Sequence, residues 1–211
     1  MFLPVTCPVC GSLADAPCEQ CIASLRSAGH LPPMPQLDRC AALYAYEGGA
    51  AALVTALKYR NARRIVPWLA RELASLVGDV DIVTWAPTTP RRRRERGFDQ
   101  ARLLAAAVGR RRHLPVRTLL RRLDTHPQTG RNRRERLDGP RFSARPVDGW
   151  KILLVDDVIT TGVTISTAAA ALRAVGAARV DGLAVAYTAH DGCRTSAPGS
   201  ATHRGHEPVG G

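Results

Sequence analysis

The chain alternates short apolar runs with longer segments in which apolar residues recur at helical spacing. The runs Asp81–Ala86 and Lys151–Val155 are rich in apolar residues, which is typical of strands that a parallel sheet buries on both faces. Arg179–Tyr187 predicts a further strand, and the shorter runs Leu43–Tyr46 and Pro115–Leu120 predict two more. Together these runs indicate a mostly parallel sheet.

Helical spacing fills most of the sequence between these strands. It predicts helices over residues 50–59, 63–77, 101–111 and 164–175, with Pro67 in a tolerant first turn and Gly176 as a C-terminal cap. Residues 87–100 and 121–149 lack this spacing. We expect a loop over residues 87–100 and a long loop or hairpin over residues 121–149. The alternation of strand and helix predicts an α/β fold with helices on both faces of the sheet.

The 211 residues suit one α/β domain with a small appendage. We expect a cysteine-rich element in residues 1–30, a proline-rich linker over residues 30–40, and the α/β domain in residues 40–190. Residues 191–211 consist largely of small and polar residues with almost nothing to bury, so we expect a disordered tail there.

The charge of the chain is strongly positive, at +12 with a pI near 10.5. Between residues 91 and 145 there are 18 arginines against five acids, which favours anionic partners such as nucleotides or nucleic acid. The alternative explanation for the many arginines is a genome of high GC content, which encodes arginine wherever any solvent-exposed cation would suffice. No apolar stretch reaches the 18 residues of a membrane span, and the first residues do not resemble a signal peptide. We therefore expect a cytoplasmic protein whose cysteines stay reduced.

Four cysteines near the N-terminus form two CxxC pairs, CPVC and CEQC, seven residues apart. Two such pairs can give one tetrahedral Zn²⁺ a complete set of thiolates with no open position. Redox thiols or free cysteines are the alternatives, and the isolated Cys40 and Cys193 are expected to be inert small hydrophobic residues. The pattern predicts a structural zinc knuckle formed by Cys7, Cys10, Cys18 and Cys21.

The sequence WKILLVDDVITTGVTI, residues 150–165, joins an apolar strand to two adjacent acids, a loop of small and hydroxyl residues, and a helix. Such a loop and helix N-terminus present N–H groups to a phosphate, and Gly162 lets the backbone approach closely. Asp156 and Asp157 would repel that phosphate unless they face something else, and the cis hydroxyls of a ribose fit two carboxylates. The pair would also favour the positive charge that develops on a sugar ring during glycosyl transfer.

An arginine-rich sequence, PTTPRRRRERGFDQ, follows the predicted strand at residues 81–86. Ligands of parallel α/β sheets bind beyond the carboxyl ends of the strands, so this loop should share an edge with the loop after Val155. Arginines there can clamp a pyrophosphate bidentately, and we favour Arg96 beside Gly97 for that role. The run Arg91–Arg94 is also consistent with a solvated surface.

The stretch VDDVITTGVT resembles the phosphoribosyl pyrophosphate (PRPP) signature of type I phosphoribosyltransferases. With CPVC…CEQC, Lys58 in ALKYR, APTTPRRRRERGFDQA and the sequence DTHPQTG, the chain resembles the ComF family of competence-associated proteins from residue 7 to about residue 188. The resemblance implies a phosphoribosyltransferase-like fold and a zinc element. It also implies a role in natural transformation, with the competence machinery and internalised single-stranded DNA as partners.

The same resemblance implies roles for individual residues. Asp156 and Asp157 would contact the ribose hydroxyls of PRPP, and Mg²⁺ would accompany its pyrophosphate. Lys58, Arg96 and Gln128 carry over as pyrophosphate or hood contacts. Backbone N–H groups and hydroxyls would hold the 5-phosphate in the segment Val158, Ile159, Thr160, Thr161, Gly162, Val163 and Thr164.

Two positions depart from the family pattern: Asp99 replaces the asparagine of RGFNQ, and Gly139 stands where an asparagine is expected. Two functions remain open. One is an enzyme that transfers ribose 5-phosphate from PRPP to an unidentified acceptor. The other is a non-catalytic module that keeps PRPP as a ligand and binds single-stranded DNA, although Phe98 and Phe142 are the only stacking candidates in the arginine-rich region. A degenerate fold with neither activity is disfavoured by the intact phosphate loop.

Overall fold

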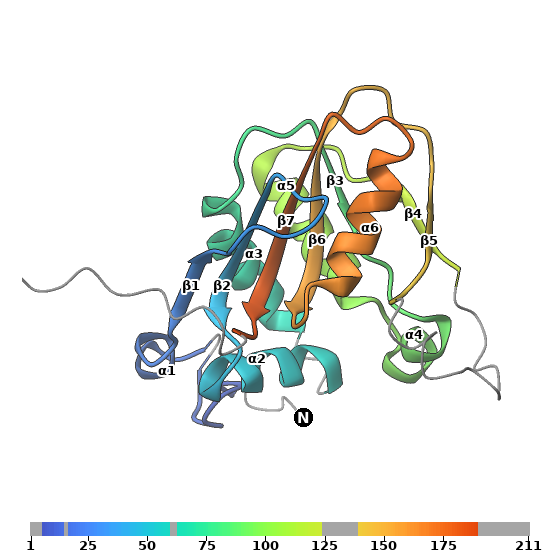
Figure 1. Ribbon diagram of the computed structural model, residues 1–211. Coiled ribbons are helices and arrows are strands. Elements are labelled where there is room, and N and C mark those ends of the chain that lie inside the picture. The colour runs from blue at the N-terminus through green and yellow to red at the C-terminus, as the bar shows by residue number, and fades with distance from the viewer. Residues whose placement is uncertain (1–5, 15–16, 60–62, 124–138, 190–211) are drawn as a thin grey trace, which may run out of the picture.

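A five-stranded sheet forms the centre of the protein (Figure 1). The computed structural model describes residues 6–14, 17–59, 63–123 and 139–189. The strand order is β1-β2-β7-β6-β3, and all neighbouring strands run parallel except β1, which is antiparallel to β2. The strands span Ser27–His30 (β1), Arg39–Ala45 (β2), Ile82–Trp85 (β3), Lys151–Ile159 (β6) and Arg179–Tyr187 (β7).

The interior strand β6, between β7 and β3, is buried on both faces, as its continuous apolar run predicts. Leu153 and Val155 point into one hydrophobic core, whereas Ile152 and Leu154 point into the other. This alternation follows from the two-residue period of a strand. The strand runs four residues further than predicted, because Asp156, Val158 and Ile159 continue the pairing with β7.

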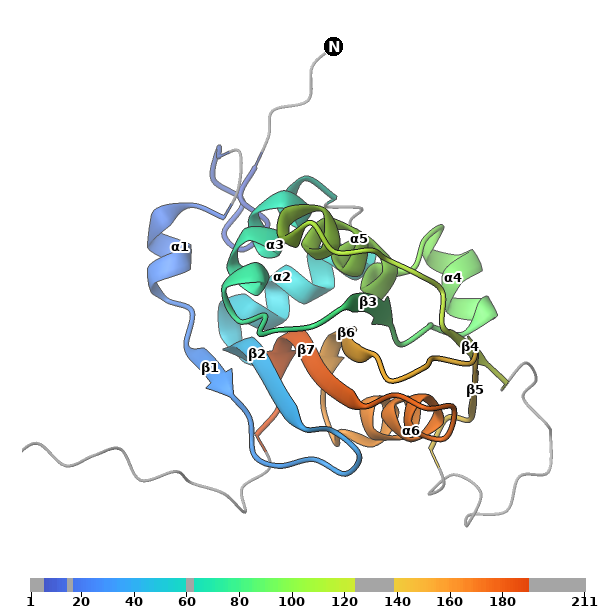
Figure 2. The ribbon, with the colours of Figure 1, turned by 90° about the horizontal axis from the view of Figure 1, so that it is seen from above.

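Helices cover both faces of the sheet, which confirms the predicted fold class (Figure 2). On one face pack α2 (Gly48–Tyr59), α3 (Val66–Ser75) and α5 (Gln100–Arg112), and on the other packs α6 (Val163–Arg173). In α3, Val66, Leu69 and Leu73 are buried at helical spacing, and a short 3₁₀ turn, Arg63–Ile65, precedes them. The single helix predicted over residues 63–77 is therefore divided.

The C-terminal end of α6 is capped as predicted. Gly176 adopts φ 101°, and the Ala177 N–H donates to the Leu172 carbonyl at 3.1 Å while the Gly176 N–H donates to Arg173. This pair of hydrogen bonds is the Schellman arrangement, in which a left-handed residue ends the helix. The chain then turns directly into β7.

A second, two-stranded sheet lies beside α6. It pairs β4 (Leu120–Arg122) antiparallel with β5 (Phe142–Ala144), which confirms the hairpin alternative for the ends of the 121–149 segment. The strand predicted over residues 115–120 is wrong. Val116 makes only an isolated bridge to Val83, because residues 113–119 cross the edge of β3 without continuous pairing.

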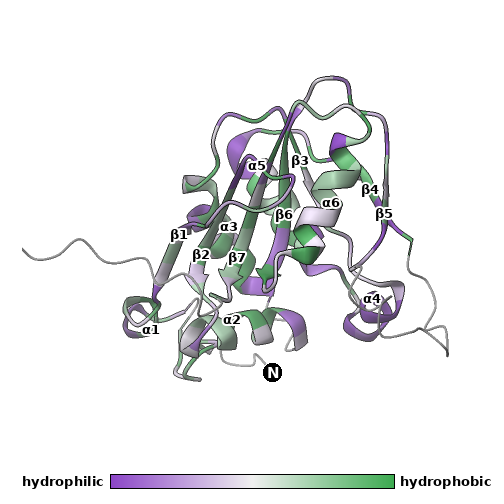
Figure 3. Ribbon diagram, viewed as in Figure 1, coloured by the Kyte–Doolittle hydropathy of each residue, from purple (hydrophilic) through white to green (hydrophobic). Residues whose placement is uncertain are grey.

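The arginine-rich stretch predicted as a loop contains a helix, α4 (Pro90–Arg96). Thr89 caps it by accepting a hydrogen bond from the Arg92 N–H at 3.2 Å, and Gly97 ends it with φ 77°. None of its residues is buried, and it is hydrophilic throughout (Figure 3). Because none of its side chains is buried, the sequence of α4 shows no periodic pattern of apolar residues from which a helix could be predicted.

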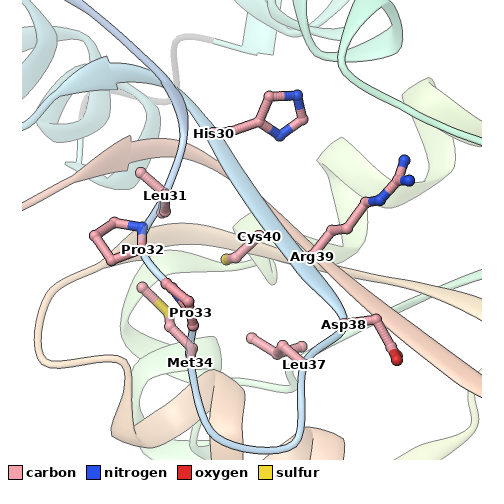
Figure 4. A pocket seen from close by; sticks show the side chains of 9 residues that line it. All are labelled: His30, Leu31, Pro32, Pro33, Met34, Leu37, Asp38, Arg39 and Cys40. Carbon is pink, nitrogen blue, oxygen red and sulfur yellow. The ribbon is translucent and has the colours of Figure 1, made fainter.

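The proline-rich residues 31–38 are not a linker between domains. They connect the paired strands β1 and β2, and Leu31, Met34 and Leu37 pack against the core on the α6 side. Figure 4 shows this loop around a cavity of ≈ 480 Å³ that Cys40 also lines. The cysteine-rich N-terminal region thus contributes a strand to the main sheet, and α1 (Glu19–Ala23) lies just before that strand.

Candidate functional site

Asp156 and Asp157 lie near the carboxyl end of β6, where α2 also ends (Figure 1). Because strand residues alternate between faces, Asp157 follows Val155 towards the helices of its face, and Asp156 follows Leu154 towards the α6 side. Lys58, in the last turn of α2, places its Nζ 3.2 Å from Asp157 Oδ2. Both side chains are largely shielded, with 19% and 15% of their surface exposed. The structure therefore brings three of the predicted site residues together.

The acid pair is electrostatically strained. Protein atoms packed around Asp156 remove water from its carboxylate, and this burial, reinforced by the negative charge of Asp157, raises its pKa well above the usual value. The Asp157 N–H donates to Asp156 Oδ1 at 2.8 Å and offsets part of that cost. A cation or a hydroxyl donor that approached these carboxylates would relieve the strain.

The turn after β6 leads into α6 through Gly162, which has φ 75°. A Cβ at this position would also lie 3.3 Å from Met34 Sδ, so both backbone angle and space favour glycine. No side chain caps this end of α6, and Thr161 Oγ1 reaches the Val163 N–H only at a long 3.5 Å. The first N–H groups of the helix and the positive end of its dipole thus face the turn, an arrangement that suits an anion.

The predicted phosphate segment is only partly loop. Val158 and Ile159 belong to β6, and Ile159 is 2% exposed in the core, so its side chain is not available to a ligand. The exposed turn consists of Thr160, Thr161 and the buried Gly162, and Val163 already begins α6. Thr164, in the first turn of α6, remains partly exposed.

Arg96 lies at the end of α4 and reaches back to the end of α2. Its guanidinium donates to the Tyr59 hydroxyl and to Gln100 Oε1, each at 3.2 Å, and it lies 5.0 Å from the centre of the Tyr59 ring. Because Tyr59 directly follows Lys58, these contacts join the arginine-rich region to the acid pair. Gln128 lies outside the described residues.

Asp99 is a buried residue of the site region that the sequence pattern did not single out for a role. It caps α5 by accepting the Arg102 N–H at 3.2 Å, and its other oxygen accepts the Thr88 N–H at 3.1 Å. Burial raises the pKa of this carboxyl, and the charge of Asp157 adds to the effect. An aspartate directly before a helix is a common cap signal, which the sequence contained.

The four N-terminal cysteines gather into one cluster. Their sulfur atoms lie within 4.8 Å of one another, and Cys10 Sγ is 3.7 Å from Cys18 Sγ. Four thiolates at about 2.3 Å from a tetrahedral Zn²⁺ lie about 3.8 Å apart, so this donor set fits such an ion. Cys40 is buried in the core away from the cluster, and burial raises the pKa of its thiol to about 12. Cys193 lies outside the described residues.

Comparison with known proteins places this arrangement in a wider context. The family model of the phosphoribosyl transferase domain matches residues 121–198. The chain is 30% identical to "Competence protein ComFC" of Bacillus subtilis (strain 168) over 186 residues, which cover 82% of this chain and 73% of that protein. It is also 30% identical to "DNA utilization protein YhgH" of Escherichia coli O157:H7 over 191 residues, 82% of this chain and 80% of that one.

Among solved structures, the crystal structure of TT1426 from Thermus thermophilus matches 65% of this chain and 88% of its own, with 19% identity and a TM-score of 0.36. The sheet, its helices and the match of residues 121–198 to this domain model give the protein a phosphoribosyltransferase-like fold. At 30% identity over most of both chains, the protein belongs to the ComF family of ComFC and YhgH, as its sequence motifs predict. Within the described residues, no helix has the length and apolarity needed to cross a membrane.

Proposed function

We propose that the acid pair and the N-terminus of α6 bind the phosphoribosyl group of PRPP. The observation that carries this proposal is the placement of two shielded carboxylates on β6 directly before an uncapped helix N-terminus. Lys58 lies beside them at 3.2 Å. The α6 N-terminus favours an anion, and the two carboxylates favour hydroxyl groups that donate hydrogen bonds. A phosphoribosyl group carries both.

Different residues of the site then bind different parts of PRPP. Asp156 and Asp157 accept hydrogen bonds from the ribose hydroxyls, and the turn with the start of α6 binds the 5-phosphate through N–H groups and the hydroxyls of Thr160, Thr161 and Thr164. Lys58, Arg96 and Gln128 contact the pyrophosphate. Mg²⁺, coordinated mainly by oxygens of PRPP, would neutralise part of the pyrophosphate's negative charge. Lys58 exchanges its Asp157 partner for the pyrophosphate as the ligand enters.

The reaction that this site supports is phosphoribosyl transfer. The bond between C1 of the ribose and the pyrophosphate oxygen breaks, its electron pair leaves on pyrophosphate, and an acceptor's lone pair bonds to C1. Positive charge grows on the ribose meanwhile, and the neighbouring carboxylates stabilise it. The protein holds both reactants in line and shields them from water.

We further propose that the cysteine cluster holds a structural Zn²⁺, because four thiolates leave no open position for a reacting water. The names of its relatives, a competence protein and a DNA utilization protein, support a role in DNA uptake. We propose that the protein acts in the cytoplasm. A non-catalytic factor that binds single-stranded DNA is the second candidate, and the 18 arginines between residues 91 and 145 favour it.

Equilibrium dialysis with PRPP and with ribose 5-phosphate, both with Mg²⁺, tests which residues contact the 5-phosphate and which contact the pyrophosphate. Thr161→Val should weaken both ligands by a similar factor, about tenfold, because it removes a hydroxyl beside the shared phosphate. Lys58→Gln should weaken PRPP far more than ribose 5-phosphate. Thr55→Val, at an exposed position of α2, is the matched control and should change neither. Unchanged binding in both site variants would refute the assignment.

A further inference from the structure

The side chain of Arg96 ties together the ends of three helices. Its Nη2 donates to the hydroxyl of Tyr59, the last residue of α2, and its Nη1 donates to Oε1 of Gln100, the first residue of α5. Arg96 itself ends α4, and Gly97, with φ 77°, turns the chain from α4 towards α5. Both α2 and α4 lie at the end of the sheet where β6 also ends, so this cluster adjoins the edge that carries the acid pair (Figure 1).

Gln100 keeps its amide at a cost to stability. The residue is only 1% exposed, and its Nε2 has no hydrogen-bond acceptor among the described residues. A buried N–H group without an acceptor destabilises a protein, whereas an apolar side chain of the same shape avoids that loss. Turning the amide over does not help, because Nε2 would then face the N–H groups of Arg96. Packing alone favours an apolar residue here, so the amide oxygen points to a function that is exerted through Arg96.

Tyr59 is exposed but held in place. Its exposed fraction is 69%, and side chains at such positions usually change rotamer freely. The Arg96 guanidinium restrains it twice, through the hydrogen bond to its hydroxyl and by lying 5.0 Å from the centre of its ring. Tyr59 directly follows Lys58, whose Nζ is 3.2 Å from Asp157 Oδ2. Arg96 is therefore fixed beside the second cation that the proposed function assigns to pyrophosphate.

Arg96 keeps donors for a ligand. A guanidinium carries about five N–H groups in one rigid plane, and Tyr59 and Gln100 use one each. In the part of the chain that the structure describes, no carboxylate forms an ion pair with Arg96. The two hydrogen bonds set the plane in which the other N–H groups lie. A group that is already oriented before its ligand arrives loses less entropy on binding.

We propose that Tyr59 and Gln100 are positioning residues that orient Arg96 for the pyrophosphate of PRPP. The inference rests on the proposed function, which places the pyrophosphate at Arg96. Both residues act through the guanidinium: Gln100 is buried beneath it, and the hydroxyl of Tyr59 holds its other side. Arg96 binds the two phosphates with its remaining N–H groups while both hydrogen bonds stay in place. The pair thus favours PRPP over ribose 5-phosphate, which has no pyrophosphate.

Equilibrium dialysis of the full-length, zinc-loaded protein with PRPP and with ribose 5-phosphate, each with Mg²⁺, tests this role. Tyr59→Phe removes the hydroxyl and keeps the ring, and Gln100→Met removes the amide and keeps a similar shape. Each should weaken PRPP binding about fivefold, roughly the value of one hydrogen bond, and leave ribose 5-phosphate binding unchanged. Tyr44→Phe removes a hydroxyl from β2, where the ring stacks on Trp68, and should change neither affinity.

Two further measurements separate positioning from a structural role. Gln100→Met should leave the melting temperature unchanged or raise it, because it removes the unpaired amide. Arg96→Gln should weaken PRPP binding at least about tenfold, since it removes a charged donor. In the Arg96→Gln background, Tyr59→Phe and Gln100→Met should weaken PRPP no further, because both act only through Arg96.

Equal losses for PRPP and ribose 5-phosphate, with a lower melting temperature in Gln100→Met, would assign the two residues a structural role and overturn the inference. So would losses that add fully to that of Arg96→Gln. Wild-type PRPP affinity in both single variants, beside a selective loss in Arg96→Gln, would remove the positioning role and leave the proposed function standing. Failure of folded wild type to bind PRPP would instead refute the proposed function, and the positioning role would fall with it.

Discussion

The Asp99 carboxylate accepts N–H groups from two places at once, Thr88 before α4 and Arg102 in α5. Two acceptor oxygens are needed for this, and an aspartate supplies both. The sequence showed only that an asparagine of the family pattern was missing, which removes an amide donor. The structure shows a position that needs acceptors, because both partners are backbone N–H groups.

Replacing Asp99 tests this interpretation. Asp99→Ala leaves two buried N–H groups without acceptors and should lower the free energy of unfolding by about 2 kcal/mol. Asp99→Asn keeps one acceptor oxygen and no longer buries a charge, so its loss should be less than half as large. Urea denaturation measures both. Equal stability of the two variants would show that the cap contributes little.

The raised pKa of Asp156 predicts a dependence of stability on pH. Between the pKa of an unfolded aspartate, about 3.9, and the higher folded value, the native state binds more protons than the unfolded state. The contribution of Asp156 to stability therefore falls as pH rises through that window. Asp156→Asn should remove this slope, and at neutral pH the variant should be more stable than wild type. Denaturation curves at several pH values measure the difference, and parallel pH profiles for the two proteins would contradict the prediction.

At the scale of elements, the buried strands and helices were predictable because burial imposes a period on the sequence. β7 agrees with its predicted bounds, and α2, α5 and α6 agree within two residues at each end. The missed elements bury little. α4 has no buried residue, and β1 is a short strand of Ser27, Ala28, Gly29 and His30 with no residue of high β-propensity. The cap signals Thr89 and Gly97 could have indicated α4, but nothing local indicates β1.

The contact between α5 and the segment after it depends on Gly109. A Cβ there would lie 2.2 Å from Val116 Cγ2 and 3.1 Å from the Leu114 carbonyl oxygen. Gly109→Ala should therefore destabilise the protein by about 1–2 kcal/mol, although alanine is the better helix former. The double variant Gly109→Ala/Val116→Ala makes room for the new methyl group and should lose less than the sum of the two single changes. Strict additivity in urea denaturation would show that no overlap exists.

At the scale of the whole molecule, α2 connects the cysteine cluster to the acid pair. Val9, inside the first CxxC pair, and Leu25, just after the second, pack against the core, and a Cβ on Gly49 in the first turn of α2 would lie 2.9 Å from Leu25 Cδ2. The other end of the same helix carries Lys58. The sequence predicted both groups of residues separately but not this connection, because their contacts are distant in the chain.

If the cysteine cluster holds Zn²⁺ as proposed, its loss should therefore lower both the stability of the protein and the affinity of the acid pair for PRPP, because α2 connects the two. Chelation, or Cys10→Ser, should lower the melting temperature by about 4–8 °C, equivalent to about 2 kcal/mol for a chain of this size, and should weaken PRPP binding several-fold. Differential scanning calorimetry and dialysis of the same samples measure the two effects. Cys40→Ala removes a buried thiol outside the cluster and should leave PRPP binding unchanged. A metal-free protein with unchanged melting temperature and affinity would show that the element is independent of the site.

The central claim is that the acid pair and the α6 N-terminus bind PRPP, and calorimetric titration of PRPP with Mg²⁺ into the zinc-loaded protein tests it most directly. Wild type should bind saturably at one site. Asp157→Ala should bind tenfold to hundredfold more weakly, about the loss expected for one hydrogen bond to a charged group. Asp148→Ala removes an exposed aspartate elsewhere and should bind as wild type does. Absence of binding by folded wild type, or equal binding by Asp157→Ala, would contradict the account.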